Sequence, residues 1–288
     1  MKDFIIITPA KNEEKSIAYT LKSVVHQTLL PKVWIIINDA SEDKTTTIIR
    51  NVIAEYPWIK LYDYPILPEN DYSSRVVSIF NYGLSLVKDD YDFIMKLDGD
   101  VSFENNFCES VLNEFEKNPL LGIASGTITN FGIPEKSIQE FGFTRGATKF
   151  YRRKCFEIIG GVVPVVSWDT IDNAAARAKG WQTKSLPIYF VHHKEEGSRV
   201  GSNLFQHFRT GLSNGNIPYY FPYFILKCLS KIRKQPYVLG AIAQLFGFIY
   251  SAYFRKLRPF PDYATTQVRS DQKKFIYNLF KSFKVKHS

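Results

Sequence analysis

Cysteine is scarce in this chain of 288 residues, which contains Cys108, Cys155 and Cys228 and no others. An odd number of widely spaced cysteines argues against a disulfide framework or a cysteine-based zinc site, and it fits a reducing compartment. The sequence also lacks low-complexity tracts and internal repeats, so we expect an ordered globular protein. A strand-like run begins within three residues of the N-terminus, and we therefore expect no signal peptide.

Acidic residues are nearly missing from the C-terminal part. From Arg199 onward the chain carries 15 Lys and Arg residues against two Asp and Glu, a net charge of +13, which leaves −4 for the rest of a chain whose total is +9. An acidic body with a strongly basic end is consistent with binding to nucleic acid or to an anionic membrane surface.

Apolar, β-branched runs alternate with segments of helical spacing over the first 193 residues. We expect strands at 3–8, 32–37, 59–62, 93–97, 121–129 and 181–193, helices at 11–27, 43–56, 75–87, 105–118, 155–161 and 167–179, and a strand or loop at 141–153. Glu13 and Glu14 would lie in the first turn of the first helix, where acids suit the helix dipole. The alternation predicts an α/β domain with a mostly parallel central sheet over residues 1–200, followed by a basic and apolar helical region over residues 201–288.

The run Phe93–Val101 contains two carboxylates, Asp98 and Asp100, with Gly99 between them. Open α/β sheets bind ligands at the carboxyl ends of their strands, where these residues are expected. Carboxylate oxygens suit Mg²⁺ or Mn²⁺ and, through the ion, a diphosphate. Taken alone, however, the tripeptide fits an ordinary acidic turn better.

Three further polar clusters fall at strand ends or helix starts: residues 8–14 (TPAKNEE), 38–41 (NDAS) and 168–172 (WDTID). Together with residues 98–100, and with residues 78–84 (SIFNYGL) on the preceding helix, they resemble in kind and order the motifs of family 2 glycosyltransferases. The resemblance covers roughly residues 3–193 and implies the GT-A fold of nucleotide-diphospho-sugar transferases. Departures from the usual motifs are Lys11 in place of Tyr, Asn38 and Ala40 in place of Asp and Gly, and Trp168 in place of Glu.

The resemblance assigns roles in binding a nucleotide-sugar donor. Asp100 would hold a divalent metal, Mg²⁺ or Mn²⁺, while Asp98 would face the ribose and the metal shell. Asp39 would accept hydrogen bonds from the nucleobase or ribose. Lys11 and Arg75 would add positive charge near the diphosphate or, equally well, lie on the solvated surface. The residues assigned to donor binding are Thr8, Ala10, Glu13, Asp39, Arg75 and Asp98. UDP is the commonest donor nucleotide in the family, and GDP and dTDP are also used.

A carboxylate is also needed to take the proton of the acceptor hydroxyl as it attacks the anomeric carbon. Asp169, at an expected helix start, is the candidate base, although an N-cap aspartate is the alternative reading. Asp172 and Trp168 are assigned to acceptor binding, with a first-turn acid as the alternative for Asp172. Direct attack by the acceptor implies inversion at the anomeric carbon, as the resemblance also does.

His192 and His193 follow an apolar strand late in the domain. GT-A enzymes often complete the metal shell with a late histidine, and imidazole is an acceptable ligand of Mn²⁺. Adjacent strand residues point to opposite faces, so at most one of the two would bind metal. We assign this role to His193 or else to His192, with an ordinary polar strand end as the alternative.

The basic end contains two apolar blocks, residues 217–229 and 237–254. The second has 18 residues and no charge, which is the lower limit for a membrane span. Basic residues flank it, namely Lys231, Arg233, Lys234, Arg255, Lys256 and Arg258. This pattern favours a helical hairpin at the membrane interface over a crossing, with a buried helix pair as the alternative. Nucleic-acid binding is disfavoured because the basic residues flank apolar blocks instead of lining a polar groove.

The leading hypothesis is a metal-dependent inverting glycosyltransferase acting on a glycan or lipid-linked acceptor. It would be cytoplasmic, peripheral or monotopic on the inner face of the cell membrane. A sugar-phosphate nucleotidyltransferase is the second hypothesis, but it calls for a glycine-rich phosphate loop, and residues 8–14 contain no glycine. The third is a non-catalytic membrane-bound saccharide-binding protein, in which Asp98, Asp100 and Asp169 need not converge.

Overall fold

The computed structural model describes residues 3–65, 72–130, 133–134, 142–164, 167–193, 204–215, 217–230, 232, 237–254 and 261–286. The chain forms two compact units, and each is treated by itself. Unit 1 comprises Met1–Pro164 and Lys179–Lys194, and unit 2 comprises Val165–Ala178 and Glu195–Ser288. The prediction from sequence placed a single boundary at residue 200.

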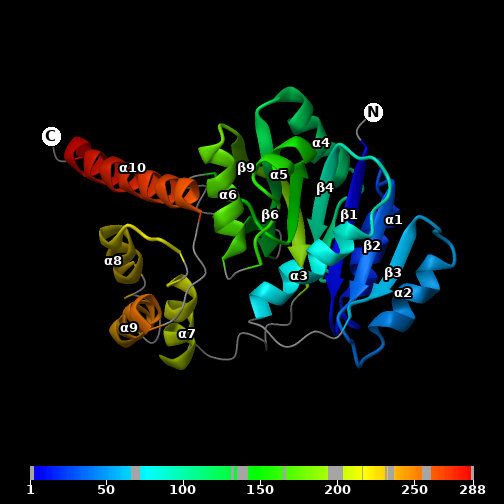
Figure 1. Ribbon diagram of the computed structural model, residues 1–288, viewed down its shortest axis with the longest axis horizontal. Helices are drawn as coiled ribbons and strands as arrows, with labels where there is room; N and C mark the ends of the chain where they lie inside the picture. Colours follow the sequence, from blue (N-terminus) through cyan, green and yellow to red (C-terminus); the bar gives the residue numbers. More distant parts are fainter. Residues whose placement is uncertain are drawn as a thin grey trace. The chain divides into compact units, whose positions relative to one another are not determined.

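The first half of the sheet in unit 1 is parallel, as the alternation of strands and helices predicts. Its strands are β1 (Phe4–Ala10), β2 (Val33–Asn38), β3 (Ile59–Asp63) and β4 (Phe93–Leu97), in the order β3-β2-β1-β4 (Figure 1). All six residues of β2 and all five of β4 are buried, as expected for strands covered on both faces.

The second half of the sheet is mixed. Strand β8 (Thr148–Arg152) is antiparallel to both β4 and β6 (Leu121–Asn130), whereas β6 is parallel to β9 (Gln182–His192). Strand β5 (Val101–Phe103) pairs antiparallel with β9, and β7 (Ile133–Pro134) pairs antiparallel with β6. The sequence did not predict β5, because three residues are too few to show a period. The segment 141–153, left open as strand or loop, contains β8.

Helices cover the sheet of unit 1 at the predicted places, with shifted boundaries. They are α1 (Ile17–Val25), α2 (Thr45–Ile53), α3 (Tyr72–Ser85), α4 (Phe107–Lys117) and α5 (Arg153–Ile158). The placement of Glu13 and Glu14 in a first helical turn is wrong, since α1 begins at Ile17. Their backbone N–H groups instead donate to Thr45 Oγ1 at 2.7 Å and to Asp43 Oδ2 at 3.0 Å.

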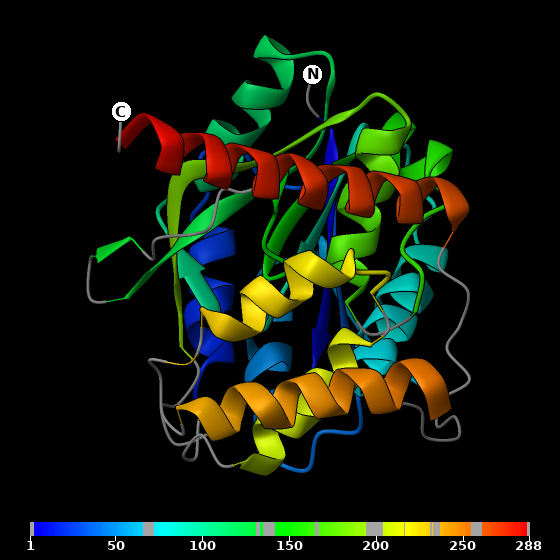
Figure 2. The ribbon, with the colours of Figure 1, turned by 90° about the vertical axis from the view of Figure 1, so that its left-hand side faces the viewer.

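Unit 2 is helical. Its described helices are α6 (Trp168–Ala178), α7 (Leu204–Asn214), α8 (Phe221–Leu229), α9 (Val238–Phe254) and α10 (Asp262–Lys286). Figure 2 shows α8 in yellow, α9 in orange and α10 in red. Both apolar blocks form helices as predicted. The sequence also predicts a closing basic amphipathic helix at residues 265–288, and α10 confirms it as far as Lys286, whereas α7 was not foreseen. The basic residues expected to flank the second block, at positions 231, 233, 234, 255, 256 and 258, lie outside the described residues.

An ion pair and an apolar cluster are among the contacts that hold the helices of unit 2 together. The Arg177 guanidinium on α6 donates through Nε and Nη2 to Asp271 Oδ2 on α10, at 3.1 and 2.8 Å. A small apolar cluster joins α8 to α9 through Phe224, Cys228 and Ala241. Within the described residues, no helix has both the length and the apolar character needed to cross a membrane.

Gly83, within the helix motif at residues 78–84, allows a test of how closely α3 packs on the sheet of unit 1. A Cβ at Gly83 would lie 2.7 Å from Ile7 Cγ2 and 3.1 Å from Ile37 Cγ1, so α3 approaches β1 and β2 too closely for a side chain. We expect Gly83→Ala to lower the free energy of unfolding by about 1–3 kcal/mol, although alanine is the better helix former. Urea denaturation measures this change.

The matched control is Ser85→Ala, two residues further on the same helix, where the side chain is exposed. Its effect should stay within about 0.5 kcal/mol. A Gly83→Ala variant that is as stable as the wild type, or more stable, would show that α3 has room to move.

Candidate active site

The loops after β1 and β2 are fastened to each other by hydrogen bonds. The backbone N–H of Asn12 donates to Ser41 Oγ at 3.1 Å, and the N–H of Glu42 donates to Asn12 Oδ1 at 2.9 Å. Asn12 and Ala40 have positive φ angles of 53° and 51°, so both turns are tight. Two of the polar clusters singled out in the sequence therefore form one rigid edge at the carboxyl ends of neighbouring strands.

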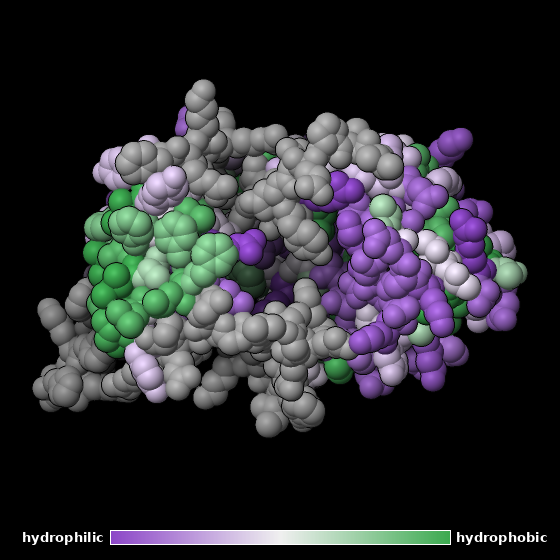
Figure 3. Space-filling model, turned by 90° about the horizontal axis from the view of Figure 1, so that it is seen from below, coloured by the Kyte–Doolittle hydropathy of each residue, from purple (hydrophilic) through white to green (hydrophobic). Residues whose placement is uncertain are grey.

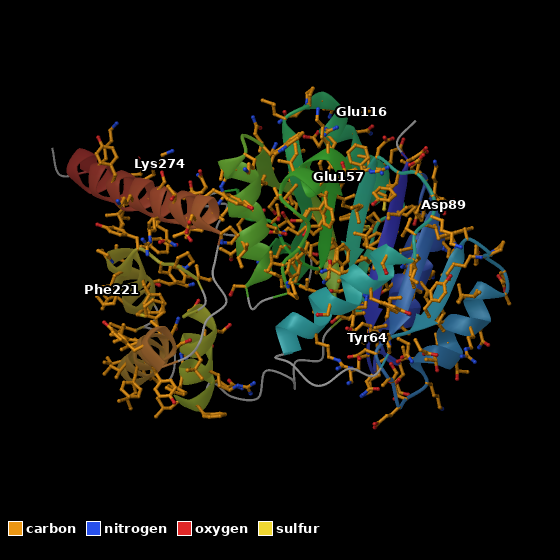
Figure 4. The ribbon with its side chains drawn as sticks, viewed as in Figure 1. Tyr64, Asp89, Glu116, Glu157, Phe221 and Lys274 are labelled. Carbon is orange, nitrogen blue, oxygen red and sulfur yellow. The ribbon has the colours of Figure 1, made fainter. Side chains whose placement is uncertain are left out.

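Asp39 is buried at this edge and holds two cations. The Arg75 guanidinium donates from Nε to both carboxylate oxygens, at 2.9 and 2.8 Å, and a further contact runs from Nη2 to Oδ1. Lys11 Nζ lies 3.7 Å from Asp39 Oδ2. The guanidinium also lies 5.6 Å from the ring centre of Tyr64, which is labelled in Figure 4. A solvated surface role is therefore excluded for Arg75, whereas the Lys11 side chain remains 42% exposed.

The Asp98-Gly99-Asp100 turn is held against the loop after β1. A Cβ at Gly99 would lie 3.3 Å from Ile17 Cδ1 and 3.5 Å from Glu13 Cγ, so the glycine permits a close approach. The backbone on the far side of the turn is fixed by Thr20, whose hydroxyl donates to the Val101 carbonyl at 2.7 Å and accepts from the Val101 N–H at 3.1 Å.

A buried lysine lies beside the acidic pair. Lys96 on β4 has a side chain only 5% exposed, and its ammonium contacts Asp98 Oδ1. This contact brings a positive charge to a turn with two carboxylates, which lowers their mutual repulsion. Lys96, like Thr20, was not identified from the sequence. Its signal was a charged residue inside an otherwise apolar strand.

The pairing of β5 with β9 adds a histidine to the two aspartates. Val101 pairs with His192 in this ladder, and the His193 N–H donates to the Asp100 carbonyl at 2.7 Å. One ligand atom from each of Asp98, Asp100 and His192 lies within 4.8 Å of the other two. His192 Nε2 is 3.4 Å from Asp100 Oδ2. These three side chains are an oxygen and nitrogen donor set that fits Mn²⁺ or Mg²⁺.

His193 lies outside this cluster, contrary to its assignment as the first choice for a metal ligand. Its Nε2 is 2.7 Å from Ser102 Oγ, and its ring stacks on Tyr19 at 4.4 Å. Burial lowers the pKa of His193, against an opposing effect of the Asp100 charge. Of the two adjacent histidines, only one was expected to face the carboxylates, and in the structure it is His192.

Two residues assigned to donor binding face the core. Thr8 is fully buried, and its Oγ1 accepts a hydrogen bond from Trp34 Nε1 at 2.9 Å. Ala10 is 2% exposed, and its carbonyl accepts from the Asp39 N–H at 2.8 Å. Burial argues against contact of either side chain with a donor, and the assignment of these two residues to donor binding stays a prediction. Glu13 is only partly buried, and its Oε2 accepts from Ser16 Oγ at 2.6 Å.

The fourth polar cluster begins α6 and belongs to unit 2. The helix starts at Trp168, so Asp169 is a first-turn acid and the N-cap alternative is wrong. Trp168 and Asp169 are partly buried, whereas Asp172 is 2% exposed, and its Oδ1 accepts from the Asn173 N–H at 2.6 Å. Burial at this level argues against direct contact of Asp172 with an acceptor. The alternative of a first-turn acid is not met either, because Asp169 is the acid in the first turn of α6.

Asp169 lies within electrostatic reach of a buried polar group in unit 2. Lys227 Nζ donates to Tyr219 OH at 2.5 Å and to Asn214 Oδ1 at 3.3 Å. Burial raises the pKa of Tyr219, and the Asp169 charge adds to this rise. Burial lowers the pKa of Lys227, whereas the charges of Cys228 and Asp169 oppose the change.

Comparison with protein families decides between the hypotheses. The model of glycosyl transferase family 2 matches residues 5–168, more than half of the chain. The chain belongs to this family. The family predicted from four clusters of residues is thereby confirmed, together with the enzyme class, glycosyltransferase.

Individual relatives are more distant. Poly-beta-1,6-N-acetyl-D-glucosamine synthase of Staphylococcus epidermidis is 30% identical over 115 residues, which are 40% of this chain and only 26% of the synthase. Among solved structures, S. aureus TarS in complex with UDP-GlcNAc superimposes with a TM-score of 0.58 and 18% identity, covering 96% of this chain and 92% of that one. Mannosyltransferase PcManGT from Pyrobaculum calidifontis, in complex with GDP-Man and Mn2+, gives 0.56 and 14%, covering 86% and 72%. These likenesses confirm the GT-A fold.

Substitution of His192 and of His193 should have different effects on metal affinity. We expect His192→Ala to weaken Mn²⁺ binding about tenfold or more, because it removes one of three ligand atoms. His193→Ala is the matched control and should leave the affinity close to that of the wild type. Titration of free Mn²⁺ by electron paramagnetic resonance measures both. A larger loss in His193→Ala than in His192→Ala would contradict the geometry.

Proposed function

We propose that the protein is a metal-dependent inverting glycosyltransferase that moves a sugar from a nucleotide diphosphate to a glycan or lipid-linked acceptor. The observation that carries the proposal is the convergence of Asp98, Asp100 and His192 at the carboxyl end of β4. The non-catalytic hypothesis, in which Asp98, Asp100 and Asp169 need not converge, has no support from the match to a family of glycosyltransferases. The second hypothesis, a nucleotidyltransferase, has no support from the family match or from the loop after β1.

The donor set at β4 fits a divalent cation with oxygen-rich ligands. When bound there by Asp98, Asp100 and His192, Mn²⁺ or Mg²⁺ would neutralise charge on the diphosphate leaving group. Manganese is supported by its presence in the complex of PcManGT. The Lys96 ammonium contacts Asp98 Oδ1 and so adds one positive charge beside the two carboxylates.

Asp39 and its two cations form the second half of the donor site. The bidentate contact with Arg75 fixes the Asp39 carboxylate at the strand end, where it would accept hydrogen bonds from the nucleobase or ribose. Lys11 is partly exposed and can turn toward a diphosphate. UDP and GDP are the nucleotides bound in the complexes of TarS and PcManGT, which supports either as the donor, and dTDP stays a third candidate.

Asp169 is the proposed general base. The acceptor hydroxyl oxygen forms a bond to the anomeric carbon as the bond from that carbon to the diphosphate oxygen breaks. The electron pair of the broken bond leaves with the diphosphate, and the hydroxyl proton passes to the Asp169 carboxylate. One displacement inverts the anomeric configuration. Trp168, the neighbour of Asp169 on α6, is proposed to contact the acceptor.

The proposed location is the inner face of the cell membrane, with the protein peripheral or monotopic. The support is the net charge of +13 from Arg199 onward and the uncharged sequence of the 17-residue α9. A membrane-bound position brings the enzyme to a lipid-linked acceptor. In the sequence of this region the basic residues flank apolar blocks, a pattern that does not favour nucleic acid.

Replacement of the base separates donor binding from transfer. We expect Asp169→Asn to lower the rate of transfer by about 10²–10⁴-fold, because the amide cannot accept the proton. The rise in melting temperature caused by UDP-GlcNAc or GDP-mannose with Mn²⁺ should persist in this variant. Thermal-shift assays with each nucleotide sugar, followed by product analysis with the one that binds, measure both quantities.

The matched control is Asp262→Asn, which alters an exposed acid in the first turn of α10 and should leave transfer unchanged. Normal turnover of Asp169→Asn would place the base elsewhere. The absence of any thermal shift with UDP, GDP or dTDP sugars in the wild type would refute the transferase assignment itself.

A further inference from the structure

Helix α9 buries polar residues and exposes large apolar ones, which is the reverse of the arrangement in a water-soluble helix. Gln244 and Ser251 are fully buried, and Gly247 lies on the same face. The outward face carries large apolar side chains, namely Leu239, Ile242, Phe246, Ile249, Tyr250 and Tyr253, which are 37–80% exposed. In water the hydrophobic effect drives such side chains inward. The arrangement is that of a helix whose outer solvent is apolar.

Close contact between α7 and α9 explains what the buried polar face does. A Cβ at Gly211 of α7 would lie 2.1 Å from the Gln244 carbonyl oxygen, and one at Gly247 of α9 would lie 2.2 Å from the Phe208 carbonyl oxygen. A Cβ at Gly215 would lie 2.3 Å from Ser251 Cβ. Small residues that let two helix backbones touch are typical of helix pairs in lipid, where apolar side chains gain nothing from facing inward.

The exposed apolar surface extends from α9 onto the two helices packed against it. Phe205 on α7 is 64% exposed, and Phe221 and Leu229 on α8 are 49% and 52% exposed. Figure 3 shows a hydrophobic area on the face of unit 2 that it presents, and Figure 4 labels Phe221 on α8. A patch of this extent on a soluble protein marks a binding surface.

Charge distinguishes among the partners that could cover this surface. Between Arg199 and Pro261 the sequence contains no Asp or Glu, and basic residues both precede and follow α9. Tyrosines lie at the two ends of the helix, at positions 237, 250 and 253, all exposed. Basic residues that flank an apolar helix in the sequence, with exposed tyrosines at the ends of the helix, complement anionic headgroups above acyl chains.

We propose that the outward face of α9, with the adjoining apolar residues of α7 and α8, embeds in one leaflet of an anionic bilayer. The helix lies in the plane of the interface, because its other face is occupied by α7. This proposal adds a contact surface to the membrane location proposed above, and it takes the side of the membrane from that proposed function. It names the surface that makes the contact and is independent of the donor site.

Vesicle co-sedimentation of the full chain tests the proposal. Vesicles of phosphatidylglycerol and phosphatidylcholine in equal parts should bind the wild type at least tenfold more tightly than phosphatidylcholine alone. The double substitution Leu239→Asp with Phe246→Asp should lower the bound fraction at least tenfold. The matched control is Leu120→Asp in unit 1, which alters a leucine of similar exposure, 56%, and should bind as the wild type does.

A second measurement does not depend on disruptive changes. Tyr253→Trp places an indole at a position that is 80% exposed, and its fluorescence should shift to shorter wavelength on addition of the same vesicles. Undiminished binding by the Leu239→Asp, Phe246→Asp variant, or an indole unaffected by vesicles, would overturn the proposal. The proposal would also be overturned if the protein formed a stable dimer that buries residue 253 and does not bind vesicles. Donor-induced thermal shifts are measured in parallel, so that failure of this surface is distinguished from failure of the transferase assignment.

Discussion

Two carboxylates separated by a single residue repel each other, and the fold around Asp98 and Asp100 is organised to hold them together. The Lys96 ammonium, itself buried, contacts one carboxylate, and the His192 imidazole lies 3.4 Å from the other. Thr20 fixes the backbone that follows through two hydrogen bonds to Val101. A divalent cation with its double charge is the natural counterpart of such a pair, because oxygen ligands of opposite charge are what it requires. The pairing of β5 with β9 is therefore the constraint on which the proposed metal site depends.

Much of the fold was accessible from the sequence because buried parallel strands are apolar throughout. The runs at β1, β2 and β4 were placed to within two residues, and so were the polar residues that follow them. The antiparallel strands were harder, since β5 has only three residues and β8 contains Lys149, which is fully buried. Neither shows the pattern that a single-sequence argument uses.

The site was predicted in its residue types more than in its geometry. Motif order brought attention to Asp39, Asp98 and Asp100, but it gave no means of choosing between His192 and His193, which requires the register of β5 on β9. It also assigned Thr8 to the ligand, although the indole of Trp34 holds the Thr8 hydroxyl inside the core. Contacts between residues far apart in sequence decide such questions, and no local pattern reports them.

The two units differ in the residues that pack between their elements. In unit 1, isoleucine, valine and phenylalanine fill the space between sheet and helices, whereas in unit 2 glycines bring the backbones of α7 and α9 into contact, with Gln244 and Ser251 buried beside them. The apolar block of 18 residues was read from the sequence as a helix at a membrane interface or in a protein core. The exposed fractions of its side chains favour the interface.

In the proposed site, Asp98, Asp100 and His192 hold one divalent cation. Anomalous diffraction from crystals grown with Mn²⁺ and UDP locates this ion. We expect a single manganese peak at about 2.0–2.6 Å from at least one atom of each of the three side chains. A manganese ion bound elsewhere in unit 1, or ligated by His193 with His192 turned away, would contradict it.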